Sequence, residues 1–82
     1  MYTVYILFSP TLDVYYKGFT SNIELRIDYH LNSKSPYTSK TNDWILVYER
    51  KFEIKKEALI EEKRLKKLNR KSILDLIDKY KV

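Results

Sequence analysis

Three short stretches of the 82-residue chain are rich in strand-forming residues. Residues 2–8 and 14–19 flank a polar segment with turn-forming residues, which predicts an antiparallel hairpin. Residues 44–52 give the strongest strand signal, with apolar residues on both faces up to Tyr48, as in a strand that is covered on both sides at one end. The pattern predicts a three-stranded antiparallel sheet.

Apolar residues recur at helical spacing in three other stretches. Residues 23–32 predict a short amphipathic helix, and residues 55–69 predict a longer one. Ser72 is a candidate cap for a final structural helix that ends near Tyr80. The inward positions expected in the longer helix are Ala58, Leu59, Leu65 and Leu68. The polar segment 33–42 is predicted to be a mobile surface loop.

These elements give the order β-β-α-β-α-α and an α+β fold in which helices flank the sheet. The chain is short enough for one domain over residues 1–82. No apolar run is long enough to cross a bilayer and the first residues lack the basic-then-apolar pattern of a signal peptide, so we expect no membrane partner and a cytoplasmic location. There is no cysteine, which excludes disulfides, cysteine nucleophiles and cysteine-based zinc sites.

Positive charge is concentrated in one part of the chain. The formal net charge is +5, and the segment 50–71 holds ten Lys or Arg residues against four Glu residues. The rest of the chain is therefore slightly acidic. Such a segment suits the phosphate backbone of a nucleic acid, although a solvated helix face has the same composition.

The hairpin contains the chain's only glycine, Gly18, and four of its eight tyrosines. Glycine alone tolerates a positive φ or a very close approach of other atoms to the backbone, so the surroundings of Gly18 are a candidate site. Tyr16 shares a strand face with Gly18, and Tyr5 lies on the neighbouring strand. Half-buried packing of the tyrosines and a simple bulge at the glycine are the structural alternatives.

Two predicted helices place charged groups on or beside apolar faces. Arg26 and His30 lie one turn apart beside the apolar stripe of residues 23–32, either as site residues or as an edge arginine and a satisfied core histidine. Glu61 and Glu62 both fall inside the apolar arc of residues 55–69. We expect at least one of these carboxylates to meet a cation, a metal or a strong donor, and the alternative is that one or both pair with a nearby Lys or Arg or lie at the rim of the arc. The helical wheel does not choose between the two glutamates.

Together these residue types match the parts of a one-metal phosphodiesterase. A single carboxylate can hold a hydrated Mg²⁺ ion that is completed by phosphate oxygens. The fork of an arginine suits a phosphate, and a tyrosine or histidine can take a proton from water. The metal would stabilise the leaving oxygen.

The run Thr3-Val4-Tyr5, followed by Tyr16-Lys17-Gly18 and then by Arg26 and His30, resembles the GIY-YIG nuclease family. The similarity is to its small stand-alone bacterial members with a single domain. It also includes residues 44–48 and extends to about Leu68, so only the last helix is generic. Thr3 and Lys17 depart from the letters of the motif, at positions that are often relaxed in the small members.

The resemblance implies a role for each residue. The stretch EALIEEKRLKKL resembles the helix that carries the family's metal-binding glutamate, and its spacing selects Glu62 as the ligand of one Mg²⁺ or Mn²⁺ ion. Tyr5 would activate the water with His30 as a proton relay. Arg26 and Tyr16 would hold the scissile phosphate.

The implied function is hydrolysis of DNA phosphodiester bonds, with repair or recombination as the expected setting. DNA would be bound through its phosphates by Arg26 and the basic segment 50–71. Fold alone does not establish activity, so two alternatives stay open. One is a non-catalytic nucleic-acid-binding module on the same scaffold, and the other is a domain whose basic helix binds an acidic partner protein.

Overall fold

The computed structural model describes residues 1–31, 41 and 43–80, and of residues 29–31 it describes the backbone alone. The elements are β1 (Tyr2–Ser9), β2 (Val14–Thr20), α1 (Ile23–Leu31), β3 (Ile45–Phe52), α2 (Lys55–Lys66) and α3 (Arg70–Lys79). The predicted order β-β-α-β-α-α is confirmed. The segment 33–42, predicted as a loop, lies outside the described residues apart from Thr41.

The three strands form one antiparallel sheet in the order β2-β1-β3. The first strand is therefore central, and β2 and β3 are the two edges. In the register of the hairpin, Tyr5 lies opposite Gly18 and Leu7 lies opposite Tyr16. The expectation that the start of β3 is covered on both faces is wrong for Ile45, whose surface is 52% exposed at this edge.

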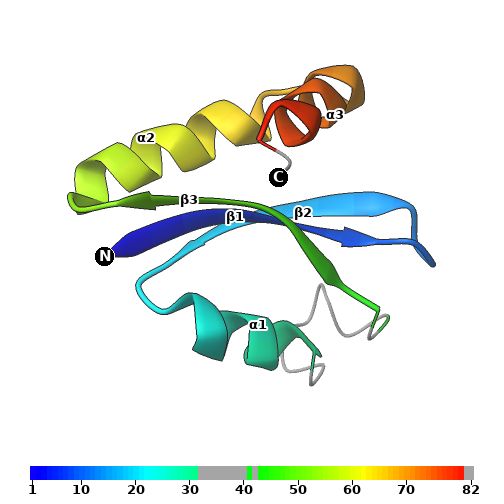
Figure 1. The fold of residues 1–82 in the computed structure, drawn as a ribbon, viewed down its shortest axis with the longest axis horizontal. Coiled ribbons are helices and arrows are strands. Elements are labelled where there is room, and N and C mark those ends of the chain that lie inside the picture. Colours follow the sequence, from blue (N-terminus) through cyan, green and yellow to red (C-terminus); the bar gives the residue numbers. More distant parts are fainter. Residues whose placement is uncertain (32–40, 42, 81–82) are drawn as a thin grey trace.

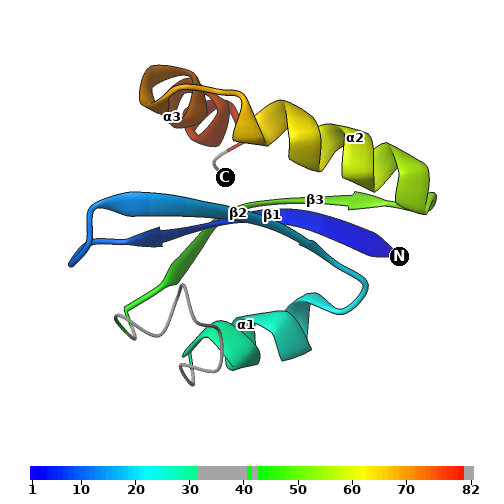
Figure 2. The same ribbon diagram turned by 180° about the vertical axis from the view of Figure 1, so that it is seen from behind.

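Helices cover both faces of the sheet (Figures 1 and 2). The helices α2 and α3 lie on one face and α1 lies on the other. Alternation along β1 divides the core accordingly, because successive side chains point to opposite faces. Val4 and Ile6 join Ala58, Leu65 and Ile73 under α2 and α3. On the side of α1, the buried cluster consists of Tyr5, Leu7 and Trp44, with Tyr16 and Ile23 packed against it.

An irregularity interrupts the pairing of β1 with β3. Ile6 pairs with Tyr48 and Leu7 pairs with Leu46, so Val47 is an extra residue on β3. A bulge of this kind re-aims the side chains that follow it. Here Tyr48 is placed in the core beneath α2.

The ends of the helices differ from the sequence-based expectation. The helix α2 ends at Lys66, and Asn69 rather than Ser72 is the N-cap of α3. The Asn69 side chain accepts a 2.9 Å hydrogen bond from the backbone N–H of Ser72. This is the ordinary capping geometry, in which a short polar side chain satisfies a first-turn donor. Leu59, expected to face inward, is 38% exposed.

Two side-chain hydrogen bonds anchor the turn between β1 and β2 to other parts of the chain. Asp13 has a φ of 54°, which short polar residues tolerate in turns. Its carboxylate accepts a 2.5 Å hydrogen bond from Arg70 at the start of α3. On the other side, the buried Ser9 hydroxyl donates a 2.7 Å hydrogen bond to Asp43, which precedes β3. No helix within the described ranges is long and apolar enough to cross a membrane.

Candidate active site

Tyr5 occupies the middle of the central strand and is only 1% exposed. Its ring lies against the backbone of Gly18, because a Cβ atom built at position 18 would be 2.5 Å from the Tyr5 Cζ atom and closer still to its hydroxyl oxygen. Gly18 has no positive φ. Of the two reasons that the sequence offered for a glycine here, close approach is the one that the structure supports.

Tyr16 lies beside Tyr5 on the face that α1 covers. The two ring centroids are 6.5 Å apart, and the ring of Trp44 meets Tyr16 edge-on at 6.4 Å. Both distances fall in the range of favourable aromatic pairs. Because Gly18 lies on the edge strand β2, the hydroxyl of Tyr5 lies toward the edge of the sheet, where side chains from the two outer layers can approach one another.

Arg26 is carried by the first turns of α1 and is exposed. The helix begins where Asn22 accepts a 3.2 Å hydrogen bond from the backbone N–H of Leu25. Arg26 helps to line a hollow of about 400 Å³, together with Thr20, Ser21, Asn22 and Leu25. Hydroxyl, amide and guanidinium groups thus share one surface depression.

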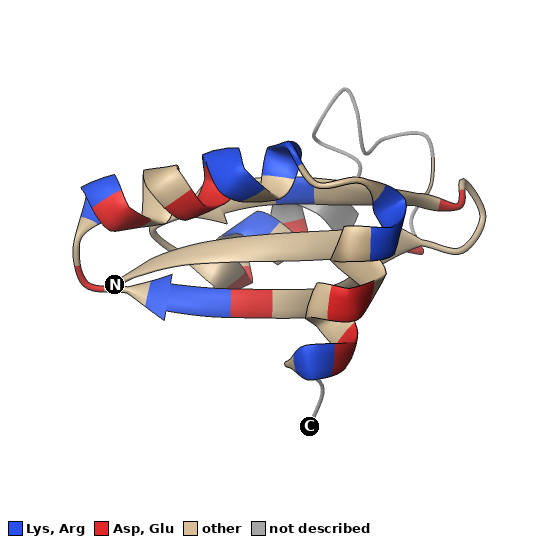
Figure 3. Cartoon of the chain, turned by 90° about the horizontal axis from the view of Figure 1, so that it is seen from above, with Lys and Arg blue, Asp and Glu red and all other residues tan. Residues whose placement is uncertain are grey.

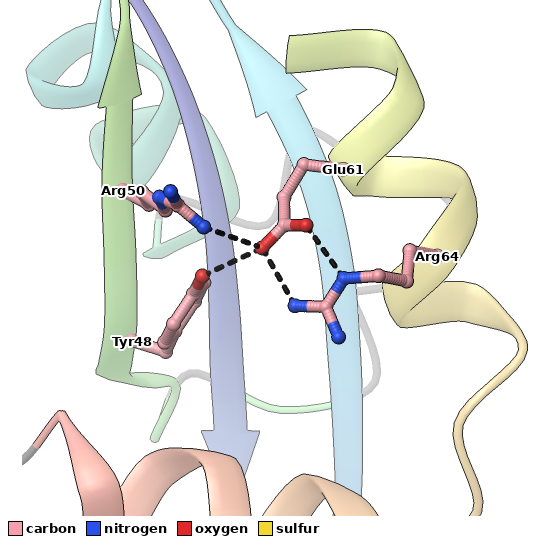
Figure 4. Close-up of polar contacts among 4 residues, drawn as sticks. All are labelled: Tyr48, Arg50, Glu61 and Arg64. Carbon is pink, nitrogen blue, oxygen red and sulfur yellow. Dashed lines mark hydrogen bonds and ion pairs between the residues drawn. The ribbon is translucent and has the colours of Figure 1, made fainter. Parts of the chain in front are cut away.

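Glu61 is buried on the inner face of α2, with 8% of its side chain exposed. Figure 4 shows it projecting toward β3, from which Tyr48 and Arg50 point back. Arg64 donates two hydrogen bonds to it, of 2.7 and 2.9 Å, and the Tyr48 hydroxyl donates a third of 3.0 Å. Arg50 lies 3.6 Å from the same carboxylate. Glu61 therefore has partners within the protein, two arginines and a tyrosine hydroxyl.

These contacts perturb the groups involved. The hydrogen bonds from Arg64 hold the pKa of Glu61 below its ordinary value despite burial. Burial, together with the hydrogen bond to that carboxylate, raises the pKa of Tyr48 to about 12. Glu61 is therefore ionised and Tyr48 is a protonated donor at neutral pH. The pair is consistent with a structural interaction in which both groups are satisfied.

Glu62 is the next residue along α2, about 100° further around the helix axis than Glu61. Its side chain is 18% exposed and forms an ion pair with Lys66, at 3.6 Å across one helical turn. Ion pairs with this spacing contribute about 0.3–0.5 kcal/mol when both partners are exposed, and here Lys66 is 57% exposed while Glu62 is largely buried. Glu62 is therefore a partly accessible carboxylate with an exposed lysine as its partner.

The electrostatic surroundings of Tyr5 link the residues of the site. Burial is the main cause that raises its pKa above the ordinary value, and the neighbouring Tyr16 and Glu62 raise it further. Arg26 acts in the opposite direction. These effects require all three groups to lie within electrostatic range of the Tyr5 hydroxyl. Tyr5 thus lies against Gly18 and beside Tyr16, and the charges of Arg26 and Glu62 act on its hydroxyl.

The side chain of His30, the fifth predicted residue, lies outside the described residues. Its backbone is in α1, one helical turn beyond Arg26. No group of three or more His, Cys, Asp or Glu side chains suited to a metal occurs among the residues that the structure describes. A cation held here by Glu62 would therefore have fewer than three such ligands from the described residues, a donor set that suits hydrated Mg²⁺ better than a fully protein-coordinated ion.

All ten basic residues of segment 50–71 are exposed. Figure 3 shows Lys and Arg along α2 and at the start of α3, with acidic residues between them. The ion pair of Lys66 with Glu62 is the alternative of a nearby basic partner that the sequence left open, whereas the Ser9–Asp43 link was missed by the sequence analysis. A Glu and a Lys four residues apart on a helix were a visible signal for the first. The second joins residues 34 positions apart, for which the sequence carries no local signal.

The fold is an α+β arrangement with two neighbouring tyrosines on β1 and β2, an exposed arginine on α1 and a partly buried carboxylate on α2. The chain belongs to the GIY-YIG family, since the pattern of the GIY-YIG catalytic domain matches residues 1–80.

Bacterial proteins of similar size resemble the chain. UPF0213 protein OB0043 of Oceanobacillus iheyensis is 39% identical over 64 residues, which cover 77% of this chain and 74% of that protein. UPF0213 protein SH2523 of Staphylococcus haemolyticus is 36% identical over 64 residues, with 77% and 78% covered. The solution NMR structure of UPF0213 protein BH0048 from Bacillus halodurans superposes with a TM-score of 0.65 at 30% identity, covering 98% of this chain and 86% of that one.

Proposed function

We propose that the protein is a DNA endonuclease that hydrolyses phosphodiester bonds with one divalent ion, Mg²⁺ or Mn²⁺. The observation that carries the proposal is the packing around Tyr5, whose ring lies against Gly18 and 6.5 Å from that of Tyr16, with Arg26 and Glu62 near enough to affect the pKa of its hydroxyl. These groups come from β2, α1 and α2, three elements separated in the sequence. Membership of the GIY-YIG family adds independent support.

Glu62 would hold the ion. Its carboxylate is partly accessible and is paired with an exposed lysine, whereas Glu61 is occupied by three hydrogen bonds. When bound, a divalent ion supplies positive charge that stabilises the leaving oxygen of the phosphodiester. Arg26 and Tyr16 would bind the non-bridging oxygens of the same phosphate, as planar and hydroxyl donors respectively.

Tyr5 would pass the proton of the attacking water along a relay. Because its pKa is raised, Tyr5 keeps its own proton near neutral pH and is not a standing phenolate. Its oxygen would accept a proton from water while its hydroxyl proton moves to the neutral imidazole of His30. The hydroxide so formed attacks phosphorus, and the bond to the leaving oxygen breaks.

The basic segment 50–71 would bind the phosphates that flank the scissile one. Its ten exposed cations suit a polyanion and carry no preference for a base sequence. The polar hollow beside Arg26 offers room for the adjoining nucleotide. We place this activity in the cytoplasm, in DNA repair or recombination.

The test is metal-dependent nicking of supercoiled and branched DNA by the wild-type protein, Glu62→Gln and Tyr5→Phe. We expect cleavage by the wild type with Mg²⁺ or Mn²⁺ and a loss of at least about a hundredfold in each variant, since each removes a group used in the reaction. Glu57→Gln is the matched control, because it makes the same change at an exposed position of α2. Equal cleavage by all the proteins would indicate a contaminating nuclease and overturn the proposal.

Binding measurements separate the remaining possibilities. Salt-sensitive DNA binding without cleavage of any substrate would favour the non-catalytic nucleic-acid-binding module. Absence of salt-sensitive binding would favour an acidic protein partner for the basic segment.

A further inference from the structure

We propose that Glu61 is a positioning residue whose link to Tyr48 sets the rotation of α2 and with it the direction of the neighbouring Glu62 carboxylate. This inference rests on the proposed function, in which Glu62 holds the metal. Glu61 itself would touch neither the metal nor the substrate.

The surroundings of Glu61 are those of a core position. It lies between Ala58 and Leu65 on the inner face of α2, and both of these residues have no exposed surface. An apolar residue would satisfy this position without the cost of burying a charge. The carboxylate is nevertheless fully engaged, by two hydrogen bonds from Arg64 and one from Tyr48. Packing alone gives no reason for a carboxylate here.

The polar contacts of Glu61 restrict the rotational orientation of α2 on the sheet, which apolar packing restricts only weakly. Burial of Ala58 and Leu65 favours contact with the sheet but is nearly indifferent to a small rotation of the helix, because the hydrophobic effect is non-directional. The 3.0 Å hydrogen bond from Tyr48 joins α2 to β3 and depends on angle as well as distance. Arg64, on the same helix, holds the Glu61 side chain in the conformation that makes this bond (Figure 4).

The position of Glu62 follows from that of Glu61. Successive residues of an α-helix are about 100° apart around the axis, and side-chain tips lie about 5–6 Å from it. A rotation of 20° would therefore move the Glu62 carboxylate by about 2 Å. Functional groups must be held within about 0.5 Å and 10–20° of their productive geometry. A small loss of rotational order in α2 is thus sufficient to misplace the metal ligand.

This reasoning predicts a separation of stability from metal binding. Exchange of a buried polar pair for apolar residues of similar volume often leaves stability unchanged or increases it. The double variant Tyr48→Phe/Glu61→Met removes the directional link and keeps an apolar interface. We expect it to unfold at the same or a higher urea concentration than the wild type, and to bind Mn²⁺ about tenfold more weakly, the lower end of the range for supporting residues around metal ligands.

The experiment measures Mn²⁺ affinity by electron paramagnetic resonance, and stability by urea unfolding, on the folded full-length proteins. Glu57→Gln serves as the control for loss of one negative charge on α2, and Glu62→Gln defines the loss of the ligand. Tyr48→Phe alone deletes only the linking hydroxyl, and we expect roughly threefold weaker binding, a part of the effect of a hydrogen bond to a charged group. The single variant Glu61→Met, which keeps Tyr48, should bind Mn²⁺ as weakly as the double variant.

The outcomes distinguish the two proposals. Wild-type Mn²⁺ affinity in the stable double variant and in Tyr48→Phe would overturn the positioning role and leave the metal site standing, provided that Glu62→Gln binds weakly. Unchanged affinity in Glu62→Gln would overturn the metal site and the positioning role with it. Weaker binding in the double variant at undiminished stability, with Glu57→Gln unchanged, would support both.

Discussion

Replacement of the single glycine by alanine tests the packing on which the site depends. The added Cβ atom would lie 2.5 Å from Tyr5 Cζ and 3.0 Å from Tyr5 Cε1, both well inside van der Waals contact. Tyr5 is almost fully buried and has little room to withdraw. Overpacking of this kind costs about 1–3 kcal/mol. Loss of glycine's flexibility in the unfolded chain returns about 0.5–1 kcal/mol, so we expect Gly18→Ala to lower the free energy of unfolding by about 1–2 kcal/mol.

The assay is a double-mutant cycle by urea unfolding and thermal denaturation. For a domain of this size the single substitution should lower Tm by roughly 5–15 °C. Tyr5→Leu removes the ring atoms that the new methyl group meets. In that background Gly18→Ala should cost nothing, to within about 0.5 kcal/mol, or should stabilise.

The decisive quantity is the coupling between the two positions. We expect at least about 1 kcal/mol, because the cost of the methyl group arises from contact with the tyrosine ring. An equal effect of Gly18→Ala in both backgrounds would refute the argument that Tyr5 is what requires a glycine at this position.

Three further predictions concern polar groups. The hydrogen bonds from Arg64 lower the pKa of Glu61, so the stability that ionised Glu61 contributes is complete above its ordinary pKa of 4.5 and is lost as pH falls through the lower pKa of the folded state. In urea unfolding from pH 6 to pH 3, the free energy of unfolding should therefore fall less steeply for Glu61→Gln than for the wild type. Parallel curves would contradict this. Lys66→Gln removes an ammonium group 3.6 Å from Glu62 and should raise Mn²⁺ affinity about twofold by titration, whereas a decrease would mean that the lysine supports the ion. Ser9→Ala removes two hydrogen bonds of a fully buried hydroxyl and should lower the free energy of unfolding, measured in urea, by about 1–2 kcal/mol. Thr11→Ala, at an exposed position whose backbone N–H still donates to Asp43, is the control. Equal losses in the two variants would count against the role of the Ser9 hydroxyl.

Much of the architecture was predictable because local pattern and tertiary packing agree. The strand predicted over residues 2–8 is observed, and Tyr5 and Val4 lie on its opposite faces. The wheel was wrong for Leu59, because the width of the buried arc depends on how the sheet meets the helix and not on helical periodicity alone. The cap of α3 was misplaced by three residues, because Asn69 and Ser72 are both good capping residues and the backbone geometry decides between them.

The candidate site, too, was only partly predictable from the sequence. Periodicity placed both Glu61 and Glu62 on the inner arc of their helix but gave them no distinct roles. Their difference comes from Tyr48. A bulge in β3 places this residue in the core, where its hydroxyl donates a hydrogen bond to Glu61. A bulge one residue long has no clear signal in the sequence WILVYERKF, so neither the partner of Glu61 nor the accessibility of Glu62 followed from the pattern.

The most direct test of a metal beside Tyr5 uses the unique glycine as a probe. In a ¹H–¹⁵N correlation spectrum of the ¹⁵N-labelled protein, Gly18 gives the one glycine amide signal of this chain. Sub-stoichiometric Mn²⁺ should broaden the amide signals of Gly18, Tyr5 and Glu62 ahead of those in α3, and Glu62→Gln should abolish this selectivity while Glu57→Gln preserves it. Broadening centred elsewhere, or unchanged in Glu62→Gln, would contradict the assignment of the metal to this site.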